Sequence, residues 1–339
     1  MKIYRLAFVS HKPLSGERGG AEIFNEEIVK NFKRYVNYVE HIEIPCSEAT
    51  FDDILRGYIT CYDLDLSRFD GVVSAKAPTY AVQHPNHVCY LVHTMRVFYD
   101  MFDEISADPS NYDKQKLIHH MDTELLKAPR VKKLFSIGHE VDKRLQEYNL
   151  LNSQVLHPGL ISGNFMCNDY DYIYVPGRLH KWKRVELVVK AMKYVKSPIK
   201  LKIAGTGEQL KELQNLAGND KRIEFLGYVT DQQMKELYAD ALCVTFTPIR
   251  EDYGMILHEA FKSQKPVITC SDSGEPAYFI KDGQNGFVVE PEPSQIAERI
   301  DILYNNKELA RHMGDCGKES IAHITWDNVV KTLLAALEA

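Results

Sequence analysis

Residues 242–261 read LCVTFTPIREDYGMILHEAF and combine three local signals. Residues 242–245 are a short apolar run typical of a buried strand, and Gly254 interrupts the pattern before an apolar helical segment. A helix that begins at Gly254 leaves the N–H groups of Met255 and Ile256 without intrahelical partners, where the helix dipole favours a phosphate. The segment therefore predicts a strand, a turn and a helix of a parallel α/β sheet, with an anion site at the helix start.

Strand-like and helical patterns alternate along the rest of the chain. Phe24, Ile28 and Phe32 recur every four residues, as on one helix face, and a second helical pattern covers residues 113–126. The predicted strands lie at residues 4–10, 71–75, 88–93, 134–137, 172–175, 201–204, 223–225, 242–245 and 267–269. This order predicts an α/β protein of two doubly wound, Rossmann-like domains with parallel sheets. Such sheets bind ligands at the carboxyl ends of their strands, so we expect a ligand in a central cleft that the two domains face.

The length of the chain also favours two domains. A chain of 339 residues exceeds the size at which single cores usually stop growing, and turn-forming groups interrupt the pattern over residues 156–169. We predict an N-terminal, acceptor-side domain over residues 1–165 and a C-terminal, nucleotide-sugar-binding domain over residues 166–320. A last helix, within residues 321–339, is expected to pack toward the N-terminal domain.

Composition excludes several classes of protein. Apolar residues make up 45% of the chain and charged residues 26%, and the net charge of −6 leaves no basic surplus for nucleic acid. The seven cysteines form no C-x-x-C pair, so we expect neither a disulfide framework nor a zinc site, and a reducing cytoplasm is the simplest location. No run approaches the ~20 apolar residues that span a bilayer. A basic cluster at Lys127, Arg130, Lys132 and Lys133 is either a solvated face or a peripheral contact with the inner face of an anionic membrane.

Two acidic residues flank the predicted anion site. Glu251 precedes the helix, and Glu259 lies about one and a half turns into it. Carboxylates beside a diphosphate would repel it, so these two are better suited to accept hydrogen bonds from hydroxyl groups, one on a sugar and one on a ribose. The alternative is an ordinary helix start with acidic residues near its N-terminus.

A basic loop follows the strand predicted over residues 172–175. The segment VPGRLHKWKR (residues 175–184) places Arg178 and Lys183 between this strand and the next helix. A guanidinium fork and an ammonium point charge suit a diphosphate that becomes more negative as its sugar departs. Solvated basic residues in an exposed loop are the alternative.

These motifs together resemble one family. Glu251 and Glu259 are separated by seven residues, and Lys183 follows Arg178 by five. Three further matching segments are LKIAGTG (201–207), FLGYV (225–229) and KDGQNGFV (281–288). The combination resembles the retaining family-four glycosyltransferases of the GT-B fold, in particular bacterial O-antigen and polysaccharide enzymes of the mannosyltransferase type.

The resemblance implies a role for each matching residue. Arg178 and Lys183 would bind the donor diphosphate, Glu251 the transferred sugar and Glu259 the ribose of the nucleoside. The other implied donor-binding positions of this half are Gly205, Gly227, Tyr228, Gly254, Met255 and Ile256.

The N-terminal half matches the family at two places. Gly19 and Gly20 resemble its glycine-rich first loop, which approaches the donor phosphate and the acceptor; a plain tight turn is the alternative. His93, in VHTMRVFYD (92–100), has the position of a family histidine that hydrogen-bonds the donor sugar. A histidine with a structural hydrogen bond is the alternative for His93.

Two departures from the family pattern lie in the donor-side loops. The usual glycine after the diphosphate lysine is Arg184, and the family's Gly-Gly-Pro-x-Glu loop has become GEPAY at residues 274–278. Asp63 and Asp65 have the D-x-D spacing of metal-dependent transferases of another fold but lack the rest of that pattern. Since two cations are present for the diphosphate, we expect no metal and no other cofactor to be required.

The sequence supports one hypothesis and two alternatives. The hypothesis is a retaining hexosyltransferase that moves a hexosyl unit from a UDP- or GDP-sugar to a hydroxyl of a glycan or lipid-linked sugar acceptor in polysaccharide biosynthesis. A sugar-nucleotide epimerase of GT-B architecture would need no acceptor, and a non-catalytic sugar-nucleotide-binding subunit would perform no transfer. The joint presence of two cations and two carboxylates in the donor motifs speaks against the non-catalytic subunit.

Overall fold

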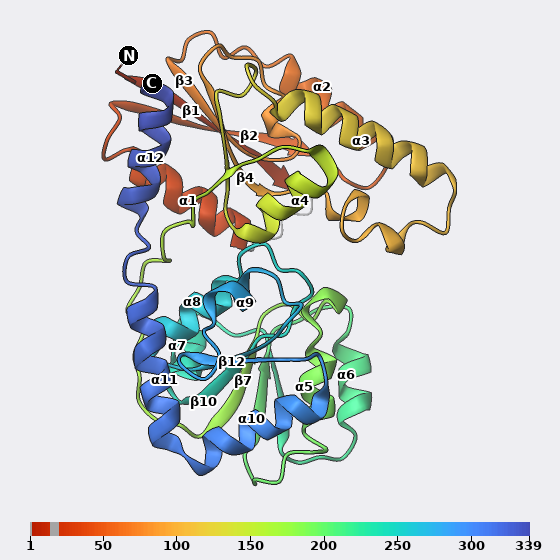
Figure 1. Ribbon diagram of the computed structural model, residues 1–339, viewed down its shortest axis with the longest axis vertical. Helices are drawn as coiled ribbons and strands as arrows, with labels where there is room; N and C mark the ends of the chain where they lie inside the picture. Colours follow the sequence, from red (N-terminus) through yellow and green to blue (C-terminus); the bar gives the residue numbers. More distant parts are fainter. Residues whose placement is uncertain (1, 14–19) are drawn as a thin grey trace. The chain divides into compact units, whose positions relative to one another are not determined.

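The computed structural model describes residues 2–13 and 20–339, which form two compact units (Figure 1). Unit 1 comprises residues 1–161 and 324–339, and unit 2 comprises residues 162–323. Within the described residues, each unit contains one six-stranded sheet whose strands all run parallel. Parallel strands need crossover connections, which explains why helices alternate with strands along the chain.

The sheet of unit 1 has the strand order β2-β1-β3-β4-β5-β6, which is a flavodoxin-like doubly wound order. Its central strands are buried on both faces, as is usual for parallel sheets covered by helices. The strands are β1 (Arg5–Pro13), β2 (Tyr38–Cys46), β3 (Gly71–Lys76), β4 (His87–His93), β5 (Lys133–Ser136) and β6 (Gln154–Val155).

The helices of unit 1 include the last helix of the chain. α12 packs against α1 and the strands β3 and β4, and its buried side chains are Trp326, Val329, Val330, Leu333 and Leu337. The hydroxyl of Thr325 caps this helix by accepting the N–H of Asn328. The α-helices are α1 (Gly20–Phe32), α2 (Phe51–Tyr62), α3 (Ser110–Leu126), α4 (His139–Asn149) and α12 (Trp326–Glu338), and the short 3-10 helices are η1 (Thr79–Ala81), η2 (Arg96–Phe98) and η3 (Phe102–Glu104).

The sheet of unit 2 has the strand order β12-β11-β10-β7-β8-β9. If β7 is numbered as strand 1 and the sheet is read from β9 to β12, this is the Rossmann order 3-2-1-4-5-6. The order reverses between β7 and β10. The strands are β7 (Tyr172–Pro176), β8 (Lys200–Ala204), β9 (Ile223–Gly227), β10 (Ala241–Thr245), β11 (Val267–Cys270) and β12 (Gly286–Val289).

The helices of unit 2 pack on this sheet and on one another. α5 contacts α6 and α10, and α8 contacts α11 and the strands β10 and β11. A capping box starts α7, in which the Thr230 hydroxyl and the Gln233 side chain each accept a backbone N–H. The helices are η4 (Lys181–Lys183), α5 (Val185–Ala191), α6 (Leu210–Ala217), α7 (Asp231–Ala239), α8 (Met255–Lys262), α9 (Glu275–Phe279), α10 (Pro293–Asn305) and α11 (Lys307–Ser320).

The structure confirms the predicted fold class of two doubly wound α/β units. Each predicted strand coincides with an observed one to within a few residues. The sequence patterns missed β2, β6 and β12. β2 has the sequence YVEHIEIPC and is mostly half-buried or exposed, because it lies at the edge of its sheet and so lacks the apolar run of a central strand.

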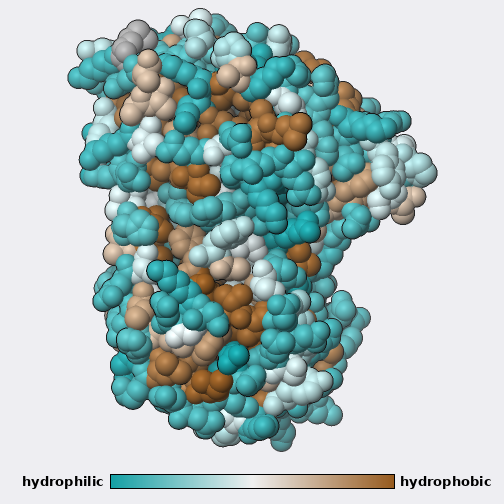
Figure 2. Space-filling model, viewed as in Figure 1, coloured by the Kyte–Doolittle hydropathy of each residue, from teal (hydrophilic) through white to brown (hydrophobic). Residues whose placement is uncertain are grey.

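The visible surface is polar. On the face shown in Figure 2, hydrophilic residues cover most of both units, and hydrophobic residues form scattered patches. Among the described helices, none combines the length and the hydrophobicity that crossing a bilayer requires.

Candidate functional site

The loops that follow β7 and β10 lie at the switch point of unit 2. The two strands are adjacent and parallel, so their carboxyl ends open on the same edge of the sheet. The β7 loop carries Arg178 and Lys183, and the segment after β10 carries Glu251 and leads into α8. Open α/β sheets bind ligands at such a point.

Two glycines bring neighbouring loops together at this edge. Gly205 follows β8 with φ +136°, and a Cβ there would lie 1.9 Å from the carbonyl oxygen of Gly177. Gly177 has φ +116°, and a Cβ there would lie 3.0 Å from Cδ1 of Ile256 in α8. The positive φ favours glycine at both positions, and at Gly205 the close approach of the Gly177 backbone also leaves no room for a side chain.

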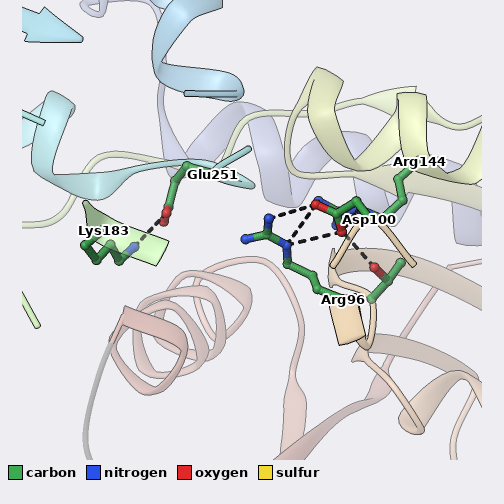
Figure 3. Close-up of polar contacts among 6 residues, drawn as sticks. Arg96, Asp100, Arg144, Lys183 and Glu251 are labelled. Atoms are coloured by element: carbon green, nitrogen blue, oxygen red, sulfur yellow. Dashed lines mark hydrogen bonds and ion pairs between the residues drawn. The ribbon is translucent and has the colours of Figure 1, made fainter. Parts of the chain in front are cut away.

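Lys183 and Glu251 form an ion pair at this edge. The Lys183 Nζ donates to Oε2 of Glu251 at 2.6 Å (Figure 3), and the two side chains are 22% and 20% exposed. The ammonium also lies 5.5 Å from the ring centroid of Phe246. The pair is reachable from solvent. An incoming anion can therefore compete for the ammonium and release the carboxylate for a hydroxyl group.

Arg178 lies in the same loop and is exposed. Within the part of the chain that the structure describes, its guanidinium has no hydrogen bond or ion pair to another residue. The fork of N–H groups is therefore available to a ligand such as a phosphate.

The start of α8 depends on Gly254. This residue has φ +82°, and a Cβ there would lie 2.9 Å from Phe246 Cε1 and from Pro276 Cγ. The helix begins at Met255, as the sequence predicted, and Met255 and Ile256 form its first turn. N–H groups of a first helical turn have no intrahelical acceptor and attract anions.

Glu259 has different surroundings from Glu251. Its Oε2 accepts a hydrogen bond of 2.7 Å from the hydroxyl of Tyr238, a fully buried residue that packs edge-on against Tyr174. Burial raises the pKa of Glu259 to about 7, and the hydrogen bond from Tyr238 opposes this rise. The Glu251 carboxylate is thus bound by the Lys183 ammonium, whereas the Glu259 carboxyl group is bound by the neutral hydroxyl of Tyr238.

The last predicted donor positions of unit 2 lie beside the β8 loop. Gly227 ends β9 with φ +66°, and its carbonyl accepts the N–H of Gly205 at 2.7 Å. The following residue, Tyr228, is 80% exposed. An exposed aromatic ring after a glycine offers a flat surface on which a planar group can stack.

In unit 1, His93 ends β4 and is paired in register with Lys76 of β3. The Lys76 Nζ lies 3.1 Å from Oε1 of Glu48, and Nε2 of His11 lies 3.9 Å from the same oxygen. Burial, followed by the charge of Lys76, lowers the pKa of His11. Polar side chains therefore gather at the carboxyl ends of β1, β3 and β4.

Two predicted positions remain, Gly19 and Gly20. Gly20 is the first residue of this helix and is exposed. Gly19 lies outside the described residues. His93 and Gly20 belong to unit 1, and the other predicted site residues that the structure describes belong to unit 2.

A buried ionic network fixes the segment after His93. Asp100 binds both Arg96, with Nη2 at 2.7 Å from Oδ2, and Arg144, with Nε at 2.9 Å from Oδ1 (Figure 3). Arg144 also donates to the hydroxyl of Thr94 at 3.1 Å. All three charged side chains are at most 6% exposed. Buried charges require this degree of pairing, so the network limits the movement of the chain next to His93.

Two cations of the basic cluster of unit 1 form hydrogen bonds within the protein. Arg130 donates to the carbonyl oxygens of Ala81 and Val82, and Lys132 donates to Asn86 and to the carbonyl oxygen of Leu337. These contacts give two of its four cations a structural role. Contact with a membrane surface stays a prediction.

Three residues that shape this edge of unit 2 have no role predicted from the sequence: Arg184, Asp272 and Tyr238. Arg184 binds Asp272, and Tyr238 binds Glu259. The partners are 88 and 21 positions apart, and no local pattern predicts such pairs. The one available signal is Arg184 itself, because a large cation stands where the family pattern has glycine.

Comparisons with known proteins show which proteins this chain resembles in sequence and in fold. Residues 166–320 match the family described as glycosyl transferases group 1. The chain is 26% identical to the uncharacterized glycosyltransferase MJ1178 of Methanocaldococcus jannaschii over 203 residues. This aligned region covers 58% of this chain and 57% of that protein. It is 30% identical over 115 residues to the mouse alpha-1,3/1,6-mannosyltransferase ALG2, over 34% of this chain and 28% of that protein. The chain thus spans about half or less of the length of these curated relatives.

A solved structure resembles the whole chain. The Anabaena protein Alr3699/HepE, crystallised with UDP and glucose, superposes with a TM-score of 0.73 over 98% of this chain and 99% of its own, at 14% identity. At this identity the similarity shows the fold. Residues 166–320 thus resemble the group 1 glycosyl transferases in sequence, and the chain as a whole has the two-domain GT-B fold.

Proposed function

We propose that the protein transfers a hexosyl unit from a UDP- or GDP-sugar to a hydroxyl of a glycan or lipid-linked sugar acceptor in polysaccharide biosynthesis, with retention at the anomeric carbon. The main support is the group at the switch point of unit 2, in which the Lys183–Glu251 pair, the exposed Arg178 and the start of α8 share one sheet edge. A nucleoside diphosphate sugar needs such a set of cations, free N–H groups and hydroxyl acceptors.

Each group has a distinct task in this proposal. Arg178 and Lys183 bind the diphosphate, and the N–H groups at the start of α8 add to its binding. When the diphosphate takes the ammonium of Lys183, the carboxylate of Glu251 accepts a hydroxyl of the transferred sugar. Glu259 accepts hydroxyls of the ribose, and the exposed ring of Tyr228, after Gly227, lies beside the base.

Leaving-group stabilisation is the main catalytic contribution of these residues. Negative charge grows on the diphosphate as the glycosidic bond breaks, and positioned cations stabilise this charge most in the transition state. The acceptor hydroxyl attacks the face from which the diphosphate leaves, and its proton passes to a phosphate oxygen. The two cations supply charge that a metal would otherwise supply, so no metal cofactor is part of the proposal.

Unit 1 contributes the acceptor side in this proposal. His93 would hydrogen-bond the transferred sugar, and Gly20, the first residue of α1, would approach the donor phosphate and the acceptor. The relatives support the substrate class: HepE was crystallised with UDP and glucose, and ALG2 is a mannosyltransferase. The donors to be tested include both a UDP-sugar and a GDP-sugar.

Alanine variants of the two cations test the function. Arg178→Ala and Lys183→Ala should each lose about 2 to 4 kcal/mol of transition-state stabilisation, measured as kcat/KM for transfer or slow donor hydrolysis with UDP- and GDP-sugars. Lys190→Ala, an exposed lysine on α5, is the matched control and should keep the wild-type rate. Wild-type turnover in both cation variants would refute the proposal. Conversion of the sugar nucleotide without acceptor would favour an epimerase, and binding without transfer or hydrolysis a non-catalytic subunit.

A further inference from the structure

Arg184 has a backbone conformation that favours glycine. It lies between η4 and α5 with φ +49° and ψ +41°. A residue with a side chain is strained in this left-handed region, and such strain is maintained only where surrounding contacts hold it. The contacts of Arg184 must therefore compensate for its backbone.

The side chain of Arg184 connects three segments of unit 2. Its guanidinium binds both carboxylate oxygens of Asp272, at 2.7 and 2.5 Å. It also donates to the carbonyl oxygens of Thr247 and Pro248, at 2.8 and 2.7 Å. The residue is only 9% exposed. One arginine fork thus joins the loop of Lys183, the segment after β10 and the segment after β11, with a geometry that lysine cannot reproduce.

The segment of Asp272 is bound in turn to the backbone of Glu251. The N–H of Arg250 donates to the carbonyl oxygen of Asp272 at 3.0 Å, and the N–H of Glu251 donates to the carbonyl oxygen of Ser273 at 2.9 Å. The Glu251 side chain binds Lys183, the neighbour of Arg184 in the chain. These contacts link Arg184, Asp272 and Glu251 in a ring that closes through the Lys183–Glu251 ion pair.

We propose that Arg184 and Asp272 are positioning residues that fix the separation of Lys183 and Glu251. This inference rests on the proposed function. Once a diphosphate has taken the ammonium, the attraction between Lys183 and Glu251 no longer holds them together. The Arg184–Asp272 contact holds the backbone of Lys183 and of Glu251. It therefore keeps the Lys183 ammonium on the phosphate and the Glu251 carboxylate on the sugar while charge develops on the diphosphate.

Two variants test this role. Arg184→Gly removes the side chain and at the same time relieves the backbone strain, so the unit should still fold. Asp272→Asn keeps the size of the partner and removes its charge. Both should lower kcat by about 10- to 100-fold, because small displacements of catalytic groups have effects of this size, and donor KM should change less than about threefold. Arg184→Lys should restore only part of kcat, since it keeps the charge without the fork.

Arg222 provides a matched control in the same unit. It also binds an aspartate with two nitrogens, at 2.8 and 3.1 Å from the oxygens of Asp220, and it donates to the carbonyl of Val195 at 3.0 Å. Arg222→Gly should lower the melting temperature and leave kcat within about twofold of wild type.

The outcomes separate the two proposals. Wild-type kcat in Arg184→Gly and Asp272→Asn, together with an inactive Lys183→Ala, would overturn the positioning role alone. An equal loss of kcat in Arg222→Gly would overturn it too, because the effect would then be one of general stability. A fully active Lys183→Ala would instead overturn the proposed function.

Discussion

The carboxyl group of Glu259 shows how one buried side chain can make the stability of unit 2 depend on pH. Burial raises its pKa in the folded protein to about 7, above the ordinary 4.5. Its protonated form is therefore favoured by folding, so this contribution is complete below about pH 4.5 and is lost as the pH rises through about 7. At about 1.4 kcal/mol per pKa unit, the loss is at most about 3.5 kcal/mol.

The isosteric variant Glu259→Gln tests this dependence. The amide cannot ionise, and its oxygen can still accept the hydrogen bond from Tyr238. Between pH 5 and pH 8 the melting temperature of the variant should fall less than that of the wild type, as measured by scanning calorimetry. Identical pH profiles would show that Glu259 titrates normally.

The first turn of α8 is the helical element on which the proposed donor site depends. Gly254→Ala introduces a Cβ that lies 2.9 Å from Phe246 and Pro276, at a φ of +82° that disfavours any side chain. The start of the helix must shift, so we expect a loss of about 1 to 3 kcal/mol of stability and at least tenfold weaker binding of UDP or GDP in isothermal titration calorimetry.

Gly218→Ala separates the two causes of this effect. Gly218 follows α6 with φ +57°, and a Cβ there would meet no atom within 4 Å. This control should lose stability through its backbone alone and keep nucleotide binding. Equal nucleotide affinities in Gly254→Ala and the wild type would contradict the role of the α8 start.

The outcomes for individual elements show what the sequence could predict. Central strands such as β7 and β10 are continuous apolar runs, because both faces are buried, and such runs stand out in the sequence. The edge strand β2 does not stand out, since exposed residues interrupt it. The start of α8 was predicted because Gly254 marks it locally, whereas the Arg184–Asp272 contact joins residues 88 positions apart and depends on the folded sheet.

The division of the whole molecule into two units has a consequence for its stability. α12 comes last in the chain, yet it packs on α1, β3 and β4 of unit 1, and the N–H of Ile3 donates to Oε1 of Glu338 at 3.3 Å. The core of unit 1 therefore requires residues from both ends of the sequence, whereas unit 2 is built from one continuous segment.

A pair of matched leucine substitutions can show whether the two cores respond separately. Leu333 on α12 and Leu303 on α10 are both fully buried, the first in unit 1 and the second in unit 2. Replacing either by alanine should cost about 2 to 5 kcal/mol, because a cavity remains. In hydrogen exchange measured by mass spectrometry, Leu333→Ala should reduce amide protection in β1, β3 and β4 more than in β7 and β10, and Leu303→Ala should do the reverse. Equal loss of protection in both sheets from either variant would mean that the chain unfolds as one cooperative body, and the stability of α12 would then control the proposed donor site as well.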